Sequence, residues 1–222
     1  MNTERIEDLK EIRRIMESSV RFLYVSGTSM LLIGLIALGG IAIHLWHYGI
    51  GISSRIMQPS GEYSKLPDES AWTNRIWETN LAADRLFMLE TALGVLFLSL
   101  VIVFLFSLRE VKKNGARLWT SASRQLLLHF GFPLFMSGLI CLRFLNENQF
   151  FLLPGLSLML YGICLLSASK FTFRQMSVLA VVEIFIGLVG LYFPETGVIC
   201  WALGFGIAHI IFGGWMNLNF RR

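Results

Sequence analysis

The stretch SVLAVVEIFIGLVGLYFPETGVICWALGFGIAHIIFGGWM, residues 177–216, decides the fold. Two apolar runs in it are separated by the turn sequence PETG at 194–197. A helix that crosses a hydrocarbon core of about 30 Å needs roughly 20 apolar residues, and each run approaches that length. The first run holds one acid, Glu183, and the second holds one imidazole, His209. The stretch therefore predicts a hairpin of two membrane-spanning helices.

The composition extends this prediction to the whole chain of 222 residues. Hydrophobic residues make up 55% of the chain and charged residues 15%, against about 25% charged in a soluble domain. Because the charges lie between apolar runs, the sequence predicts an all-α, polytopic membrane protein whose partner is the lipid bilayer. The net charge of +4 lies beside the predicted spans, where Lys and Arg set topology, so no nucleic-acid partner is indicated.

Six apolar runs predict six transmembrane helices, arranged as three hairpins, in a domain over residues 20–217. The predicted spans are about 21–45, 86–108, 126–144, 150–168, 176–193 and 197–217. An external segment at 46–85 separates the first two spans, and a helix that continues into the second span is expected to begin near residue 70. Only five of the 19 Lys and Arg residues fall on the external side, which predicts that both termini, including the tail 218–222, are cytoplasmic.

Two cytoplasmic segments are candidate surfaces for a protein partner. Residues 1–19 contain a predicted amphipathic helix, which either lies on the inner leaflet or docks to a partner. Its apolar side carries Ile6, Leu9, Ile12, Ile15 and Met16. The second segment is the loop 109–125, which has five basic residues against one acid. These basic residues are Arg109, Lys112, Lys113, Arg117 and Arg124.

Small residues recur at corresponding places in the spans. The odd spans share the cores LIGLIAL at 32–38, MSGLICL at 136–142 and FIGLVGL at 185–191. Each core has a glycine at its third position: Gly34, Gly138 and Gly187. The even spans carry small residues seven apart: Ala92 and Ser99, Gly155 and Gly162, Gly206 and Gly213. Residues seven apart share one helix face, where small side chains let a neighbouring helix approach closely. The pattern predicts three repeated hairpins about an axis along the membrane normal, unless it reflects only the abundance of small residues in membrane helices.

Glu183 and His209 form the strongest candidate site. An ionised carboxylate in hydrocarbon costs roughly 2.5–3.5 kcal/mol on insertion scales, so a buried acid needs a partner or a purpose. Both residues are expected at a similar depth, which makes a contact between them natural within the last hairpin. The contact is either a structural clasp or a centre that relays protons or senses pH. A second polar set, Glu90, Arg143 and His44, is expected toward the external side, with an ion pair between Arg143 and Glu90.

No sequence motif indicates catalysis. The chain has no HExxH pair, no GxSxG elbow and no P-loop, so we predict no catalytic residue, metal or cofactor. The three cysteines, Cys141, Cys164 and Cys200, lie within apolar runs and are expected to pack as small apolar residues.

Several stretches resemble an uncharacterised family of bacterial six-span inner-membrane proteins. They are IRRIMESSVRFLYVSG at 12–27, KKNGARLW at 112–119, YGICLLSASKFTF at 161–173 and WALGFGIAHIIFGG at 201–214. The segment 46–85 does not match. The resemblance implies the six-span fold and the inner (cytoplasmic) membrane, but no activity or site residue. The glycine-spaced hairpins are similar, in pattern only, to acid-resistance membrane proteins of the HdeD type.

Together these features predict a non-enzymatic membrane scaffold or sensor that acts through a partner. The alternative is a small-solute or proton-coupled transporter that uses Glu183 and His209. A homo-oligomer is compatible with both hypotheses.

Overall fold

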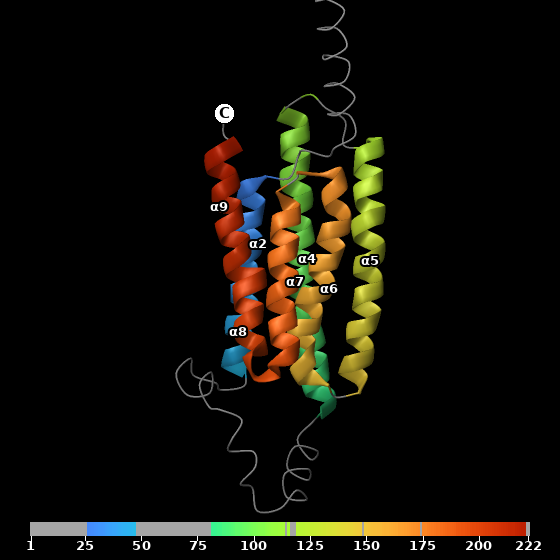
Figure 1. Ribbon diagram of the computed structural model, residues 1–222, viewed down its shortest axis with the longest axis vertical. Helices are drawn as coiled ribbons and strands as arrows, with labels where there is room; N and C mark the ends of the chain where they lie inside the picture. Colours follow the sequence, from blue (N-terminus) through green and yellow to red (C-terminus); the bar gives the residue numbers. More distant parts are fainter. Residues whose placement is uncertain are drawn as a thin grey trace, which may run out of the picture.

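The computed structural model describes residues 26–47, 81–113, 115, 119–147, 149–173 and 175–220. In this part of the chain every regular element is helical (Figure 1). The α-helices are α2 (Gly27–His47), α4 (Leu81–Lys113), α5 (Ser121–Asn146), α6 (Leu153–Ala168), α7 (Met176–Tyr192), α8 (Gly197–Trp201) and α9 (His209–Phe220). Short 3-10 turns flank α6 and α7, namely η2 (Phe150–Leu152), η3 (Ser169–Phe171) and η4 (Pro194–Thr196). A π-helical segment, η5 (Ala202–Ala208), joins α8 to α9.

Local sequence signals set several helix boundaries. Thr120 caps α5: its hydroxyl accepts a hydrogen bond from the Ser123 amide at 3.2 Å, and the Ser123 hydroxyl accepts one from the Thr120 amide at 2.8 Å. Pro154 lies in the first turn of α6, where its missing amide hydrogen is not needed. Gly115 has a φ of +60° in the α4–α5 loop, a conformation that glycine adopts without strain.

Five helices are long and apolar enough to cross a membrane, which indicates a multi-pass membrane protein. They correspond to the predicted spans 21–45, 86–108, 126–144, 150–168 and 197–217, with ends that differ by a few residues. The remaining predicted span, 176–193, forms α7, an apolar helix of 17 residues that falls just below the usual spanning length. The predicted amphipathic helix in 1–19, most of the segment 46–85 and the end of the tail lie outside the described residues.

The helices pack in an open series. Helix α4 lies against α2, and α2 lies against α9 and η5. The last span consists of α8, η5 and α9, and it lies against α7 through α8 and η5. Helix α7 lies against α6, and α6 lies against α5. Figure 1 shows these helices standing along one common direction, with α9 and α5 at its two sides. The most extensive contacts are α6 with α7 and α2 with α9, so the bundle contains two tight helix pairs.

Small residues make both tight pairs possible. A Cβ atom built on Gly187 would lie 2.9 Å from the carbonyl oxygen of Gly155 and 2.8 Å from the Cα of Met159, both on α6. A Cβ on Gly34 of α2 would lie 2.6 Å from the carbonyl oxygen of Gly206 in the last span. Since these neighbours are backbone atoms, larger side chains would force the helices apart. The sites predicted at Gly155, Gly162, Gly206 and Gly213 are likewise in close contact with a facing helix.

The prediction for Gly138 is wrong within the single chain. Gly138 is exposed on α5, and a Cβ atom there would meet nothing within 4 Å. The physical reason is that α5 packs mainly on α6, which it contacts through Ser137 and Cys164, and no other described helix covers Gly138. A small residue marks a face that can be approached closely but does not determine whether a helix covers it.

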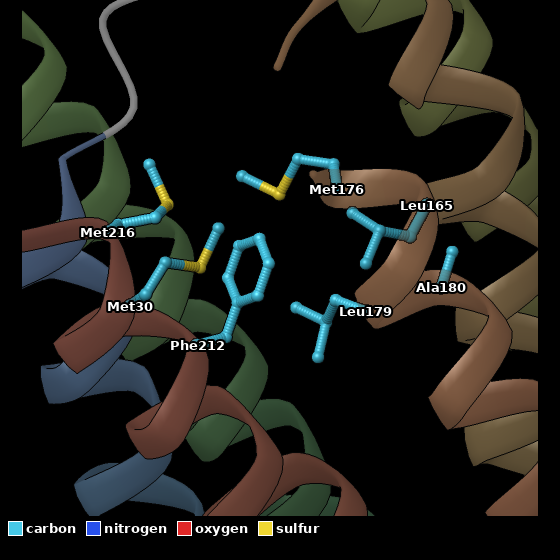
Figure 2. Packing of buried hydrophobic residues seen from close by; sticks show 7 residues of the cluster. All are labelled: Met30, Leu165, Met176, Leu179, Ala180, Phe212 and Met216. Carbon is cyan, nitrogen blue, oxygen red and sulfur yellow. The ribbon is translucent and has the colours of Figure 1, made fainter. Parts of the chain in front are cut away.

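A cluster of buried apolar side chains joins the two tight pairs (Figure 2). Met30, Phe212 and Met216 project from α2 and α9, and Met176 and Leu179 project toward them from α7. Leu165 and Ala180 complete the cluster. We call this set the methionine cluster. Unbranched methionine side chains adapt to irregular gaps, so this cluster fills the space between α9 and α7.

We expect Gly187→Ala to lower the thermal-unfolding midpoint of the purified protein. Overpacking against the α6 backbone costs about 1–3 kcal/mol, which outweighs the gain of about 1 kcal/mol in helix propensity from glycine to alanine. Gly39→Ala is the matched control, because a Cβ there meets nothing within 4 Å. Equal midpoints for the two variants would contradict the close-packing assignment.

Candidate functional site

The two polar residues predicted to meet inside the membrane do meet. Glu183 on α7 and His209 at the start of α9 are both 0% exposed. His209 Nδ1 lies 3.2 Å from Glu183 Oε1. The same nitrogen lies 3.2 Å from the carbonyl oxygen of Gly204, and His209 Nε2 lies 3.0 Å from the hydroxyl of Tyr161 on α6. The site therefore joins α6, α7 and the last span, and we call it the Glu183 centre.

Gly204 makes room for the carboxyl group. A Cβ atom at this position would lie 2.5 Å from Glu183 Oε2 and would also overlap the side chain of Leu158. Gly204 belongs to the π-helical segment Ala202–Ala208, which ends directly before His209. Short π-helical insertions occur frequently at functional sites, where they change the direction of one side chain. Here the segment brings His209 Nδ1 to the carbonyl oxygen of a residue five positions earlier.

The geometry selects one imidazole tautomer. A carbonyl oxygen can only accept a hydrogen bond, so its contact with His209 Nδ1 requires the proton to be on Nδ1. In the neutral ring Nε2 then accepts a hydrogen bond from the Tyr161 hydroxyl. The single Nδ1 hydrogen lies between the Gly204 carbonyl and Glu183, and neither oxygen of Glu183 has a well-aligned hydrogen bond to any described residue. The Glu183–His209 contact is thus an ion-pair distance without full hydrogen-bond alignment.

Charge balance limits the protonation states of the centre. Protonated Glu183 beside neutral His209 is neutral overall, and so is ionised Glu183 beside imidazolium. These two states contain the same number of protons. Loss of that proton leaves a carboxylate alone among buried groups, which is the costly state. A centre that is neutral overall is therefore the less costly arrangement for these two buried groups.

Aromatic and apolar side chains surround the centre. Phe205 packs edge-on against Tyr161 at a ring separation of 5.1 Å, and Trp201 packs against Phe205 at 5.2 Å. The methionine cluster lies one turn away, since Leu179 precedes Glu183 and Phe212 follows His209. A low-polarity environment of this kind strengthens each electrostatic interaction inside it.

The methionine cluster lies on the side of the centre that faces one end of the bundle. At that end α4 finishes, α5 begins and α6 finishes, with exposed Arg109, Lys112, Lys113, Arg124 and Lys170. We call it the basic end. Of the predicted basic loop, Arg117 lies outside the described residues.

The second predicted polar set does not assemble as expected. Arg143 pairs with Glu147, the residue that caps the C-terminus of α5, and not with Glu90. Glu90 is exposed on α4. The reason is the helix order, because α4 packs on α2 while α5, which carries Arg143, packs on α6. His44 is half-buried at the end of α2, where its ring stacks near Phe87 of α4.

The cysteines are not members of the Glu183 centre. Cys164 and Cys200 are buried, Cys141 is partly buried, and all three are free thiols. Within the described ranges no group of three His, Cys, Asp or Glu side chains is placed to hold a metal ion.

The sequence did not identify two members of the centre, Tyr161 and Gly204. Tyr161 was visible only as the aromatic residue before Gly162 in the repeated pattern, at the place that Phe212 takes before Gly213. The available signal was that Tyr161 carries a hydroxyl group at the position where Phe212 has none. Gly204 carried no signal, because its role depends on the π-helical turn.

We expect Tyr161→Phe to destabilise the protein by about 1–3 kcal/mol, since it leaves the buried Nε2 of His209 without a donor. Thermal unfolding of the purified protein measures this loss. Tyr192→Phe removes the same hydroxyl from a side chain that is 80% exposed and should have little effect. The assignment of Tyr161 fails if the two variants unfold at the same temperature.

Comparison with known proteins identified no relative of this chain. No protein-family model matches the chain, and no curated protein or solved structure shows significant similarity to it. No residue role is therefore transferred from another protein, and the function rests on the geometry of the Glu183 centre.

Proposed function

We propose that this chain is a non-enzymatic, pH-responsive sensor of the bacterial inner membrane, with six spans and both termini in the cytoplasm. Helix α7 supplies the sixth span, since its 17 mostly apolar residues extend about 25 Å and a locally thinned bilayer accommodates the difference. Basic side chains gather at one end of the bundle, which supports a cytoplasmic location for the basic end. Three hairpins of similar sequence account for the recurring small residues.

A single observation carries the sensing function. The Glu183 carboxyl group is completely buried, lies 3.2 Å from His209 Nδ1 and has no well-aligned hydrogen bond to the part of the chain that the structure describes. A purely structural clasp would be expected to satisfy both oxygens of a buried carboxylate. An acid left partly unsatisfied responds to changes in hydration and proton supply, as intramembrane acids of proton-linked proteins do.

The location of the centre suggests how a proton would change the structure. His209 belongs to the α2–α9 pair, whereas Glu183 and Tyr161 belong to the α6–α7 pair. Protonation changes the interaction between the two pairs while their internal glycine contacts are unaffected. The methionine cluster, next to the centre, would transmit the resulting shift to the basic end, where a protein partner is expected.

We expect Glu183→Gln to abolish the protonation change of the centre. In infrared difference spectra of the reconstituted protein, a pH step should produce a carboxyl band that this variant lacks, because the amide keeps the shape but cannot ionise. Glu195→Gln is the control, since Glu195 is exposed in the turn between α7 and α8. A buried carboxyl band that persists in Glu183→Gln would refute the proposal.

Proton-coupled transport of a small solute is the second candidate. It is favoured by the placement of an acid, an imidazole and a phenol on three neighbouring helices inside the bundle. Sealed vesicles separate the two functions: a solute-dependent proton flux that Glu183→Gln abolishes would assign transport. The absence of flux in vesicles whose protein still shows the carboxyl band would assign sensing.

We expect deletion of residues 1–19 to remove the partner without affecting membrane insertion. The predicted amphipathic helix in this segment, or the neighbouring basic loop 109–125, would supply the docking surface. Mild-detergent purification from native cells, followed by mass spectrometry, compares the proteins that accompany the full-length and shortened chains. Undiminished association after the deletion would contradict docking through the N-terminal helix.

A further inference from the structure

Every buried methionine in the described part of the chain belongs to the methionine cluster. Met30, Met176 and Met216 are 5%, 2% and 3% exposed. The remaining described methionines are only half-buried or are exposed. Methionine fills irregular gaps anywhere in a protein core. Gap filling therefore does not explain why all the buried methionines of the described residues gather at one place.

Three different helices supply these side chains. Met30 lies in the first turn of α2, Met176 is the first residue of α7, and Met216 lies near the end of α9. A Cβ atom on Gly213 would lie 3.0 Å from the Cβ of Met30, so α2 approaches α9 closely about one turn before Met216. The three positions are far apart in the sequence, and no local motif indicates that they meet.

The thioether groups of the three methionines face one another. Figure 2 shows them projecting toward a common space beside the ring of Phe212. The leucine and alanine members of the cluster, Leu165, Leu179 and Ala180, lie to the right of the ring in the same view. The sulfur-bearing side chains are therefore drawn together and are not distributed evenly through the cluster.

Three thioether sulfurs form a ligand set for a soft, monovalent metal ion. Soft sulfur ligands select Cu(I), whereas Mg²⁺ and Ca²⁺ prefer oxygen ligands. Zn²⁺ takes cysteine, histidine or carboxylate ligands, and none of these belongs to the cluster. A monovalent ion also brings the smallest charge into a buried layer, where an isolated charge is costly. The chemistry of the cluster thus favours Cu(I) over the common divalent ions.

We propose that the methionine cluster binds one Cu(I) ion through the sulfur atoms of Met30, Met176 and Met216. Phe212, the aromatic residue beside them, adds a π surface that attracts cations. The site goes beyond the proton-responsive function, because none of its ligands belongs to the Glu183 centre. A bound ion joins α2 and α9 to α7 and so links the two tight helix pairs directly.

X-ray absorption at the copper edge tests the ligand set. The full-length protein is produced with selenomethionine, purified in mild detergent under anaerobic reducing conditions and loaded with one equivalent of Cu(I). We expect three selenium neighbours around copper, because only methionine carries the label. Copper that is not retained would overturn the proposal, and so would sulfur neighbours without selenium, which assign the ion to the free cysteines Cys141, Cys164 or Cys200.

Single substitutions test each ligand separately. Met30→Leu, Met176→Leu and Met216→Leu nearly conserve volume and apolar character, so each variant should fold, and the thermal-unfolding midpoint checks this. Loss of even an outer-shell partner of a metal ligand costs 10–100-fold in metal affinity. We therefore expect each variant to bind Cu(I) at least about tenfold more weakly in competition with a chromophoric Cu(I) chelator.

Met136→Leu is the matched control, because Met136 is exposed on α5 and lies outside the cluster. This variant should bind Cu(I) as the wild type does. A folded Met30→Leu, Met176→Leu or Met216→Leu variant that keeps the wild-type Cu(I) affinity would refute the three-sulfur site.

Discussion

Close approach of helix backbones at small residues is the constraint on which the rest of the structure depends. A bilayer offers no hydrophobic gain for bringing two apolar helices together, so packing must supply the attraction. The α2–α9 and α6–α7 pairs achieve it by placing glycines opposite carbonyl groups of the facing helix. These contacts position both helix pairs without any polar side chain, and the pairs determine which side chains can meet between them.

The Glu183 centre is the polar consequence of that arrangement. Gly204 lets the carboxyl group reach the last span, and the carbonyl of the same residue orients the imidazole. Tyr161 then completes the chain of contacts from the α6 side. One backbone position therefore both admits the acid and sets the tautomer of its partner, so the centre is positioned by backbone geometry as much as by its side chains.

Sequence reasoning succeeded where one local property decides the outcome. Apolar runs located the long helices because the thickness of the bilayer sets their length, and the depth of Glu183 and His209 in their runs predicted that they would meet. The sequence did not predict the contacts that depend on which helices lie next to each other. Gly138 has the same local pattern as Gly34 but no helix covers it within the chain, and Arg143 found Glu147 because α4 and α5 are not packed together. Tyr161 and Gly204 were missed because helix order and the π-helical turn bring them to the site.

The contrast between stiff and adaptable contacts indicates where the structure can change. Within each tight pair, the helix backbones approach closely at glycines, and interiors packed in this way deform little. Part of the boundary between the pairs is filled by flexible methionine side chains, which tolerate rearrangement. The principal described polar link across this boundary is His209, which contacts Glu183 and Tyr161 on the other pair. Under the proposed sensing function, a change of one proton there would act on the contact between the two pairs and leave the glycine contacts inside each pair unchanged.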